Sequence, residues 1–524
     1  MTWFTRYFQD RKRQAQRPRR KKGSRLRCLL VVERLEDRVT PSLVSDINPL
    51  AGGQPANLTA VGSTLFFSAR DEAHGLELWK TDGTPAGTVL VKDINVGPRG
   101  TDFREFVNVN GTLFFAATDE AHGLELWKSD GTAAGTVLVK DIFSGNNSSL
   151  PSHLTNVNGT LFFTAVDGSH GRELWKSNGT ANGTVLVKDI IPGRGYSYAD
   201  SLTNVNGTLF FRVNDGVHGA EIWKSNGTAN GTVLVKDIVP GADSSIPTYL
   251  TNVNGELFFS ANDGTTGREL WKSDGTTDGT VEVKDIRPGF LSSNAGFLAN
   301  FNGTLFFSAN DGVNGQELWK SDGTDAGTVL VKDIRSGPDS SYAGYFTTVG
   351  GTLFFIAFDP EHGLELWKSD GTADGTVLVK DINPGANLST PTKLTDVNGT
   401  LFFTATVGAS GTELWKSDGT ADGTVLVKDI LPGRGSSQPM FLTNLNGLLF
   451  FSANDGQVGR ELWKSNGTAN GTVLVKDIGP GSYGSDLKAL TDANGTLFFT
   501  ADDGTHGREL WKSDGTTVGT SLVK

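Results

Sequence analysis

The sequence predicts an all-β protein, a β-propeller of ten 48-residue repeats, each folded as a four-stranded blade. One motif, ELWKSDGT at residues 125–132, recurs ten times, and its tryptophan returns every 48 residues without a slip. Turn signals divide each repeat into four short segments, as in the blades of a propeller. No longer segment shows the 3.6-residue apolar period of a helix, so helices are not expected.

A strict repeat indicates one structural unit copied end to end, with each copy burying its apolar surface against its neighbours. A large aromatic side chain at one fixed repeat position is typical of packing, because burial of such a ring is strongly favourable. We therefore assign the repeated tryptophans to the core. They are Trp79, Trp127, Trp175, Trp223, Trp271, Trp319, Trp367, Trp415, Trp463 and Trp511.

Each strand of the blade has its own signature. The first is a short apolar segment such as 249–253, and an Asn-Gly pair at 254–255 supplies the positive φ of a tight hairpin turn. The second strand, for example 305–309 (LFFSA), is followed by an Asp-Gly loop. The third contains the tryptophan, as at 317–320, and after the SDGT turn comes the fourth, 329–334. Phe, Val, Leu, Thr and Trp suit pleated sheets.

The second strand does not alternate between apolar and polar residues, so both of its faces must be covered. Stacking between two neighbouring blades covers both. A parallel β-helix is the main rival, but its rungs are shorter than 48 residues. The unbroken period favours one ten-bladed ring over two five-bladed propellers. Residues 43–47 (LVSDI) copy the fourth strand, so we expect the N-terminal copy to pair with the last blade and close the ring.

Composition separates a basic leader, residues 1–42, from an acidic body, residues 43–524. The net charge of −11 divides into +9 for the leader, with thirteen Lys/Arg and four Asp/Glu, and −20 for the body. An acidic body argues against a nucleic-acid partner, since phosphate binding needs a basic surface. The single cysteine, Cys28, allows no internal disulfide, and no apolar run is long enough for a transmembrane helix.

The leader begins with aromatic residues that would share one helical face (Trp3, Phe4, Tyr7 and Phe8) and continues with a dense basic run. Its apolar stretch, 28–32, is shorter than that of an ordinary secretory signal. Two interpretations stay open, a segment that contacts an anionic membrane surface or an export machine, and a solvated tail.

Two resemblances extend this interpretation. Residues 32–42 (VERLEDRVTPS) resemble the N-terminal leader of many large bacterial exported proteins, which implies export or a surface location. The recurring Glu-Leu-Trp-Lys-(Ser/Thr)-(Asp/Asn)-Gly-Thr motif resembles the bacterial ELWxxDGT-repeat proteins over residues 43–524. That family implies a repeat architecture on exported or surface proteins and no established reaction.

Charged residues that recur in every blade are expected to be structural, because an active site is built once. Glu173 and Lys176 flank a tryptophan, and we expect such pairs to form ion pairs or to support turns between blades. An Asp opens the loop before the third strand in nine copies, for example Asp263, with Val407 as the exception. Turn capping is the main interpretation of this Asp, and Ca²⁺ binding is the alternative. Six repeats carry a histidine in the same loop, one per blade, which disfavours a metal cluster.

The segments between the fourth strand and the next first strand are where the copies diverge. Phe103, Phe290, Phe297 and Phe441 lie there, together with nearly all of the tyrosines. Varied aromatic residues on one face of a uniform scaffold suggest a binding surface. The predicted binding residues are Tyr196, Tyr198, Tyr249, Tyr342, Tyr345 and Tyr483.

The sequence thus predicts a non-enzymatic exported or cell-surface protein that binds a glycan or a surface partner through one propeller face. No catalytic residue, metal ligand or cofactor is assigned. A purely structural surface or matrix protein is the first alternative. A propeller-type hydrolase or lyase is the second, and it is disfavoured because no blade carries a unique catalytic set.

Overall fold

The structure of the protein is a computed structural model that describes residues 47–48 and 51–524. The predictions for the leader, residues 1–42, therefore lie outside the described residues. The body, Val44–Lys524, is one compact unit. It contains forty strands and, in the described residues, no helix. The same residues accordingly contain no apolar helix of membrane-spanning length.

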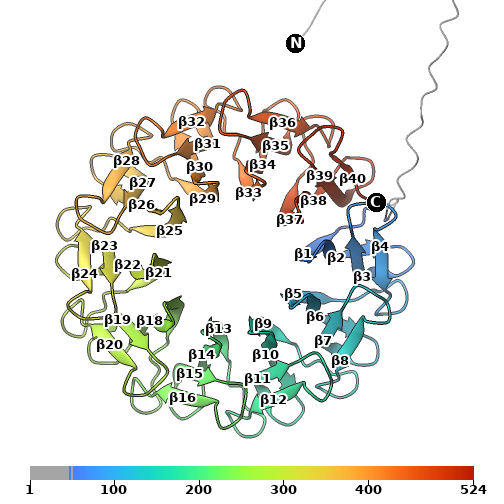
Figure 1. Cartoon of the computed structure of the whole chain (residues 1–524), viewed down its shortest axis with the longest axis horizontal. Helices are drawn as coiled ribbons and strands as arrows, with labels where there is room; N and C mark the ends of the chain where they lie inside the picture. The colour runs from blue at the N-terminus through green and yellow to red at the C-terminus, as the bar shows by residue number, and fades with distance from the viewer. Residues whose placement is uncertain (1–46, 49–50) are drawn as a thin grey trace, which may run out of the picture. The chain divides into compact units, whose positions relative to one another are not determined.

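The strands form ten separate four-stranded antiparallel sheets, each made of four strands consecutive in sequence. These sheets are the blades of one closed ring, numbered here 1 to 10 along the chain (Figure 1). The prediction of a ten-bladed β-propeller in a single ring is confirmed, and the alternative of two five-bladed propellers is wrong.

The first strand of each blade lies innermost, and we call the ten together the inner wall (Figure 1). Each ends at the predicted tight turn, where Asn206 and Gly207, for example, have φ of 48° and 87°. The inner strands are β1 (Ala56–Val61), β5 (Phe103–Val109), β9 (Ser152–Val157), β13 (Asp200–Val205), β17 (Thr248–Val253), β21 (Gly296–Phe301), β25 (Gly344–Val349), β29 (Thr392–Val397), β33 (Met440–Leu445) and β37 (Lys488–Ala493).

The second strand is buried on both faces, as its unbroken apolar run predicts. In blade 6, Leu305 and Phe307 pack against blade 5, whereas Phe306 packs against blade 7. The second strands are β2 (Thr64–Asp71), β6 (Thr112–Asp119), β10 (Thr160–Asp167), β14 (Thr208–Asn214), β18 (Glu256–Asn262), β22 (Thr304–Asn310), β26 (Thr352–Asp359), β30 (Thr400–Val407), β34 (Leu448–Asn454) and β38 (Thr496–Asp502).

The third strand carries the tryptophan, opposite the second phenylalanine of the strand before it, as in the pair Phe259 and Trp271. All ten tryptophans are only 5–7% exposed, which confirms them as core residues. The third strands are β3 (Gly75–Thr81), β7 (Gly123–Ser129), β11 (Gly171–Ser177), β15 (Ala220–Ser225), β19 (Arg268–Ser273), β23 (Gln316–Ser321), β27 (Gly363–Ser369), β31 (Gly411–Ser417), β35 (Arg460–Ser465) and β39 (Arg508–Ser513).

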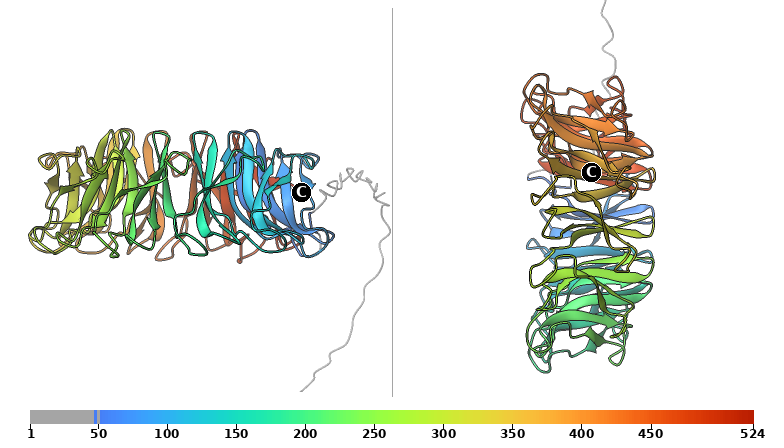
Figure 2. Two further views of the ribbon diagram at one scale, coloured as in Figure 1. Left: turned by 90° about the horizontal axis from the view of Figure 1, so that it is seen from below. Right: turned by 90° about the vertical axis from the view of Figure 1, so that its left-hand side faces the viewer.

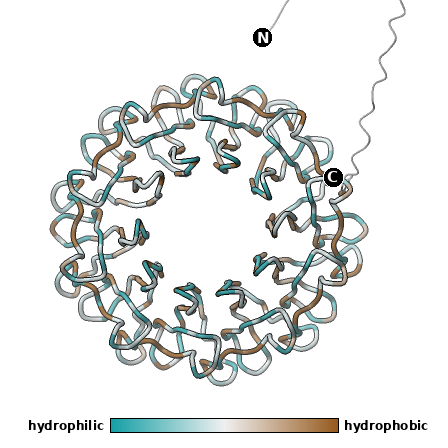
Figure 3. The backbone as a smooth tube through the Cα atoms, viewed as in Figure 1, coloured by the Kyte–Doolittle hydropathy of each residue, from teal (hydrophilic) through white to brown (hydrophobic). Residues whose placement is uncertain are grey.

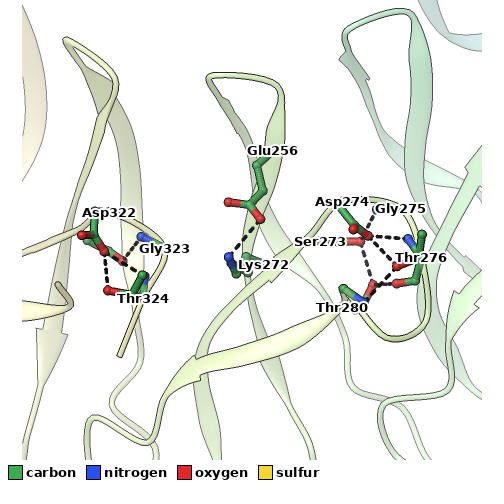
Figure 4. Close-up of polar contacts among 12 residues, drawn as sticks. Glu256, Lys272, Ser273, Asp274, Gly275, Thr276, Thr280, Asp322, Gly323 and Thr324 are labelled. Atoms are coloured by element: carbon green, nitrogen blue, oxygen red, sulfur yellow. Dashed lines mark hydrogen bonds and ion pairs between the residues drawn. The ribbon is translucent and has the colours of Figure 1, made fainter. Parts of the chain in front are cut away.

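The SDGT turn before the outer strand is a closed polar network (Figure 4). In blade 5, Asp274 accepts a bond of 2.7 Å from the Thr276 amide, and Ser273 Oγ accepts one of 2.9 Å from the Gly275 amide. Thr280 Oγ1 lies 2.7 Å from Ser273 Oγ. The outer strands are β4 (Val89–Lys92), β8 (Val137–Lys140), β12 (Val185–Lys188), β16 (Val233–Lys236), β20 (Val281–Lys284), β24 (Val329–Lys332), β28 (Val377–Lys380), β32 (Val425–Lys428), β36 (Val473–Lys476) and β40 (Ser521–Leu522).

The hydrophobic core is divided into ten clusters, one at each junction between blades. In the junction between blades 4 and 5, Phe210 and Ile222 from one blade meet Phe259 and Trp271 from the next. The hydrophobic stretches of the backbone tube accordingly repeat around the ring (Figure 3). No blade has a core of its own, so each is stabilised by its neighbours.

The two chain ends meet at the junction between blades 10 and 1. Ile47, 5% exposed, packs with Val523 and Leu510 of blade 10 and with Trp79 of blade 1. Gln54 N donates to Arg508 O at 2.8 Å, as connecting loops do at other junctions. The N-terminal segment thus contributes to the junction that closes the ring, whereas its pairing with the last blade stays a prediction. The outer strand of that blade, however, is β40 from the C-terminal end, and residues 43–46 of the predicted pairing strand lie outside the described residues.

Because the four strands of each blade are antiparallel, the loops that connect them divide between two faces of the ring (Figure 2). The connecting loops between blades and the loops between second and third strands share one face, where Leu150 N, for example, donates to Leu124 O at 3.2 Å. We call this the variable face. The Asn-Gly and SDGT turns lie on the opposite face.

Candidate functional site

Every inner strand is interrupted by a β-bulge near the variable face. In β17 the register with β18 shifts between Thr248 and Thr251, and Tyr249, which lies between them, has a φ of 58°. This left-handed conformation is uncommon for residues other than glycine and is often found at functional positions. We call this place the bulge position. It is occupied by Asn57, Glu105, His153, Ser201, Tyr249, Phe297, Tyr345, Lys393, Phe441 and Ala489, all with positive φ.

Three consecutive bulge positions carry aromatic rings that form one row along the inner wall. The centroid of the Tyr249 ring lies 6.3 Å from that of Phe297, which lies 5.6 Å from that of Tyr345. The three residues are 51%, 42% and 64% exposed, respectively. Large aromatic surface is thus left in contact with solvent across blades 5, 6 and 7. We call these three residues the aromatic row.

Glycines make room for this row. A Cβ at Gly296 would lie 3.4 Å from Cε2 of Tyr249, and one at Gly344 would lie 3.3 Å from Cδ2 of Phe297. Each of these rings therefore rests on the backbone of the next blade. No other inner strand has glycine at this place, and Thr248 and Thr392 are the counterparts in blades 5 and 8. Each of the two glycines lies in a blade whose own bulge residue is aromatic and whose preceding blade also has an aromatic bulge residue.

The row continues into a small hollow at the junction of blades 7 and 8. Its volume is about 260 Å³, and its lining includes Tyr345 and Lys393, which occupy consecutive bulge positions, and the strand residues Thr347 and Thr392. Burial, together with the charge of Arg460, lowers the pKa of Lys393. Its Nζ donates to the carbonyl of Pro439 at 3.3 Å.

A second left-handed position lies three residues before the bulge and extends the apolar surface toward the variable face. Tyr198, Ile246 and Tyr342 occupy it in blades 4, 5 and 7, with φ between 48° and 54°. All three are exposed large hydrophobic residues. These residues lie just before the inner strands, and they extend the exposed apolar surface toward the variable face in blades 4, 5 and 7.

The six predicted tyrosines lie in four places. Tyr249 and Tyr345 are in inner strands, not loops, and belong to the aromatic row. Tyr198 and Tyr342 lie at the second left-handed position. The ring of Tyr196 is 5.7 Å from that of Tyr198, and Tyr196 lines a second hollow of about 370 Å³ with Arg194. Tyr483, at 97% exposure, lies in blade 10 and contacts no other ring among the described residues.

Among the phenylalanines, Phe297 joins the aromatic row, whereas the assignment of Phe103 to the binding surface is wrong. Phe103 is 8% exposed and packs against Phe106 and Phe115 in the core. Sequence reasoning missed Gly296, Gly344 and Lys393. Glycine occurs at this repeat position only at 296 and 344, and this was the signal that could have identified the two glycines.

The connecting loops that lead to the bulge positions are anchored by the glutamate of the repeat motif. Glu269 accepts a hydrogen bond of 2.7 Å from the amide of Ser293, and Glu317 accepts one of 2.8 Å from the amide of Ser341. Both glutamates are fully buried, and burial raises the pKa of each to about 7. Two roles were predicted for these glutamates, ion pairing and support of turns between blades. The hydrogen bonds to the connecting loops show the second role. The motif lysine Lys272 pairs instead with Glu256, at 3.1 Å (Figure 4).

The Asp of the loop before the third strand caps that loop. Asp167 accepts a bond of 2.6 Å from the amide of His170, and its other oxygen lies 2.7 Å from Nδ1 of the same histidine. This hydrogen bond raises the pKa of His170. Turn capping by the Asp is therefore confirmed. Within the described ranges no three His, Cys, Asp or Glu side chains gather as metal ligands, and Ca²⁺ binding stays an untested alternative.

No protein-family model and no curated protein matches the chain. Similar solved structures include a puromycin hydrolase, with 14% identity and a TM-score of 0.31 over 68% of this chain and 59% of that one. A prolyl endopeptidase has 11% identity and a TM-score of 0.33, over 67% and 54% of the two chains. Prolyl oligopeptidase B from Galerina marginata has 12% identity and a TM-score of 0.32, over 63% and 50%. The alignments thus cover only 50–59% of these proteins, and similarity this weak carries no inference about activity.

Proposed function

We propose that the protein is a non-enzymatic, exported or cell-surface binding protein that holds a glycan against its inner wall. The observation that carries this proposal is the aromatic row, Tyr249, Phe297 and Tyr345, whose three rings are exposed and whose first two rings lie against glycines of the next blade. Sugar rings have apolar faces edged by hydroxyl groups. Tyrosine offers a rigid, amphipathic surface that stacks on such faces at low entropic cost.

The regularity of the row fits a polymer better than a compact ligand. Neighbouring rings are 5.6 and 6.3 Å apart, and they come from one position in three successive blades. A chain of linked sugars presents one ring after another, so that several weak stacking contacts add along it. The bulge contributes rigidity, because its left-handed backbone is fixed by the strands on either side.

A non-enzymatic role is supported by the motif glutamates, because they form hydrogen bonds to loops. The motif glutamates recur in all ten blades. The bonds of Glu269 and Glu317 are made to the loops that position the wall. The export part of the proposal depends on the resemblance of residues 32–42 to bacterial export leaders.

The proposal is tested by screening the full-length protein on a glycan array and then measuring affinities for the glycans bound. Combined replacement of Tyr249, Phe297 and Tyr345 by alanine should abolish binding, because three stacking surfaces are lost, while the melting temperature changes little. Tyr483→Ala is the matched control, since it removes an exposed tyrosine outside the row. If no glycan binds the folded protein, the structural alternative is favoured. Binding that survives the triple replacement would place the site elsewhere.

A further inference from the structure

We propose that the glycan is acidic, and that Lys393 pairs with one of its carboxylates at the end of the aromatic row. This inference rests on the proposed function and names the class of ligand. Lys393 occupies the bulge position that follows Tyr345, so the row leads from blade to blade onto an ammonium group. The hollow of about 260 Å³ joins the two side chains.

The bulge positions divide the ring into two unlike halves. Blades 5 to 9 carry, in order, Tyr249, Phe297, Tyr345, Lys393 and Phe441. The other five blades carry small or polar residues and the acidic Glu105, without a Tyr, Phe, Lys or Arg. A run of rings interrupted by one cation is the pattern expected for a chain of sugars in which one member bears a negative charge.

Lys393 has no acidic partner among the described residues. Cations elsewhere around the ring are paired with carboxylates, for example Arg212 of the second strand β14 in blade 4 and Lys488 of the inner strand β37 in blade 10. Arg212 lies 2.5 Å from Asp200, and Lys488 lies 3.1 Å from Asp486. Lys393 donates only to the Pro439 carbonyl, and the group that faces it electrostatically is another cation, Arg460. A carboxylate placed in the hollow would therefore meet an unneutralised positive charge, and charge-assisted hydrogen bonds are stronger than neutral ones.

The size and charge of the site favour a sugar carboxylate over other anions. The hollow is smaller than the roughly 300–1,000 Å³ of drug-sized pockets, which suits a single sugar ring. Single-stranded nucleic acid would also stack on aromatic rings, but it needs a basic groove along its backbone. The body is acidic, with a charge of −20, and this charge is screened beyond about 8 Å at physiological salt. A single lysine can therefore bind one carboxylate even though the surface of the body as a whole is acidic.

The test compares each acidic oligosaccharide with a matched form in which its carboxylates are reduced to alcohols. Oligogalacturonides, oligomannuronates and hyaluronan oligosaccharides serve as probes, and calorimetry of the full-length protein measures the affinities. The acidic form should bind about fivefold to tenfold more tightly than the reduced form, a preference that weakens as salt is added. Lys393→Met should remove the preference, because it weakens binding of the acidic form more than binding of the reduced form, whereas Lys393→Arg should keep it. Lys488→Met is the control, because Lys488 is already paired.

The outcomes separate this inference from the proposed function. Equal binding of acidic and reduced forms, or a preference that persists in Lys393→Met, would overturn the inference and leave glycan binding intact. Absence of binding to every acidic and neutral glycan would overturn both. Tighter binding of single-stranded DNA than of any oligosaccharide would overturn the choice of ligand class.

Discussion

The tryptophan of each repeat is held between two blades, and its packing accounts for much of the stability of a junction. Trp271 of blade 5 packs against Ile222, Val235 and Ile238 of blade 4. The ammonium group of Lys236 lies 5.9 Å from its ring centroid, as expected for a cation–π contact. The indole Nε1 is buried without a hydrogen-bond partner. The contribution of this side chain is therefore one of shape and apolar surface.

Replacing this tryptophan tests the assignment. Trp271→Ala should lower the free energy of unfolding by about 3–5 kcal/mol, because a large cavity opens at the junction. Denaturant titration followed by far-UV circular dichroism measures the loss, and the transition should become less cooperative, since blades couple mainly to their neighbours. Trp271→Phe should cost less than Trp271→Ala, because the phenyl ring fills much of the cavity and Nε1 has no hydrogen bond to lose. A variant that unfolds like the parent but no longer binds glycan would mean that the residue contacts ligand.

The glycines beneath the aromatic row allow a second test at the scale of single residues. Gly344→Thr introduces the residue found at this position in blades 5 and 8, so the strand backbone should accept it. The new side chain would displace the ring of Phe297, whose Cδ2 lies 3.3 Å from the position of the added Cβ. Glycan affinity should fall roughly twofold to tenfold, in line with the loss of one aromatic pair contact, with little change in melting temperature. Thr392→Ser is a control at the same repeat position, and unchanged affinity in Gly344→Thr would argue against the row as the binding surface.

Sequence reasoning identified the residues whose role is repeated and the aromatic residues of the row, but it did not identify the contacts that bring the row together. The ten tryptophans share one environment, so their period indicated the core. The contact of Phe297 with Gly344 joins residues of adjacent blades, and only a three-dimensional arrangement brings them together. The bulge position left no local signal, because no glycine marks its positive φ.

At the scale of elements, the connecting loop is stabilised by hydrogen bonds to the buried motif glutamate, whose carboxyl group has a pKa near neutrality in blades 4, 5 and 6. Burial raises the pKa of Glu221, Glu269 and Glu317 from 4.5 to about 7. Between these two pH values the folded state binds more protons than the unfolded state, so folding is favoured by acid. This contribution is fully present below about pH 4.5 and is lost as the pH rises through about 7. The histidines have the same sign, because hydrogen bonds to Asp raise the pKa of residues such as His170.

The melting temperature should accordingly fall as the pH is raised from about 5 to about 8, which calorimetric scans at constant ionic strength can measure. Aspartates such as Asp274, whose pKa is lowered by hydrogen bonds from Thr276, have the opposite sign but act only below pH 3.8. Replacing Glu221, Glu269 and Glu317 by glutamine should flatten the slope, because three titrating groups are removed. A melting temperature that rises with pH across this window would contradict the assignment.

The strands themselves were predictable from the sequence to within one or two residues. The predicted second strand at 305–309 is observed as β22, Thr304–Asn310, and the predicted third strand at 317–320 as β23, Gln316–Ser321. Apolar composition and turn residues are local properties, which is why they sufficed. Tyr249 begins the predicted first strand at 249–253 and is observed in β17, but its left-handed conformation was not predicted, because the shifted register is set by pairing with β18.

At the scale of the whole molecule, the number of blades followed from the sequence, but the number of rings followed only weakly. Each cluster joins two consecutive blades, so the same local contacts would serve a smaller ring. The angle between blades decides closure, and that angle comes from packing. The asymmetry of the inner wall is also a property of the whole ring, because the aromatic and cationic bulge residues occupy consecutive blades (Figure 1).

Nine junctions between blades are crossed by a continuous chain, whereas the tenth is closed only by noncovalent contacts of the two ends. Ile47 is central to that closure, since it packs with Val523 of blade 10 and Trp79 of blade 1. Its counterpart at the junction of blades 4 and 5, Ile238, is buried to a similar degree in a covalently continuous junction. Comparing the two isoleucines therefore separates loss of packing from opening of the ring.

Ile47→Ala and Ile238→Ala should each remove about 2–5 kcal/mol of packing energy, yet they should differ in what unfolds first. In Ile47→Ala the ring can open at its seam, so native-state hydrogen exchange should show blades 1 and 10 losing protection before the others. The exposed apolar faces of those blades should also promote self-association, which sedimentation can detect. In Ile238→Ala the continuous chain keeps blades 4 and 5 adjacent, and protection should fall only locally. An equal loss of protection in all blades of Ile47→Ala would mean that the ring unfolds as a single cooperative unit and that its seam is no weaker than its other junctions.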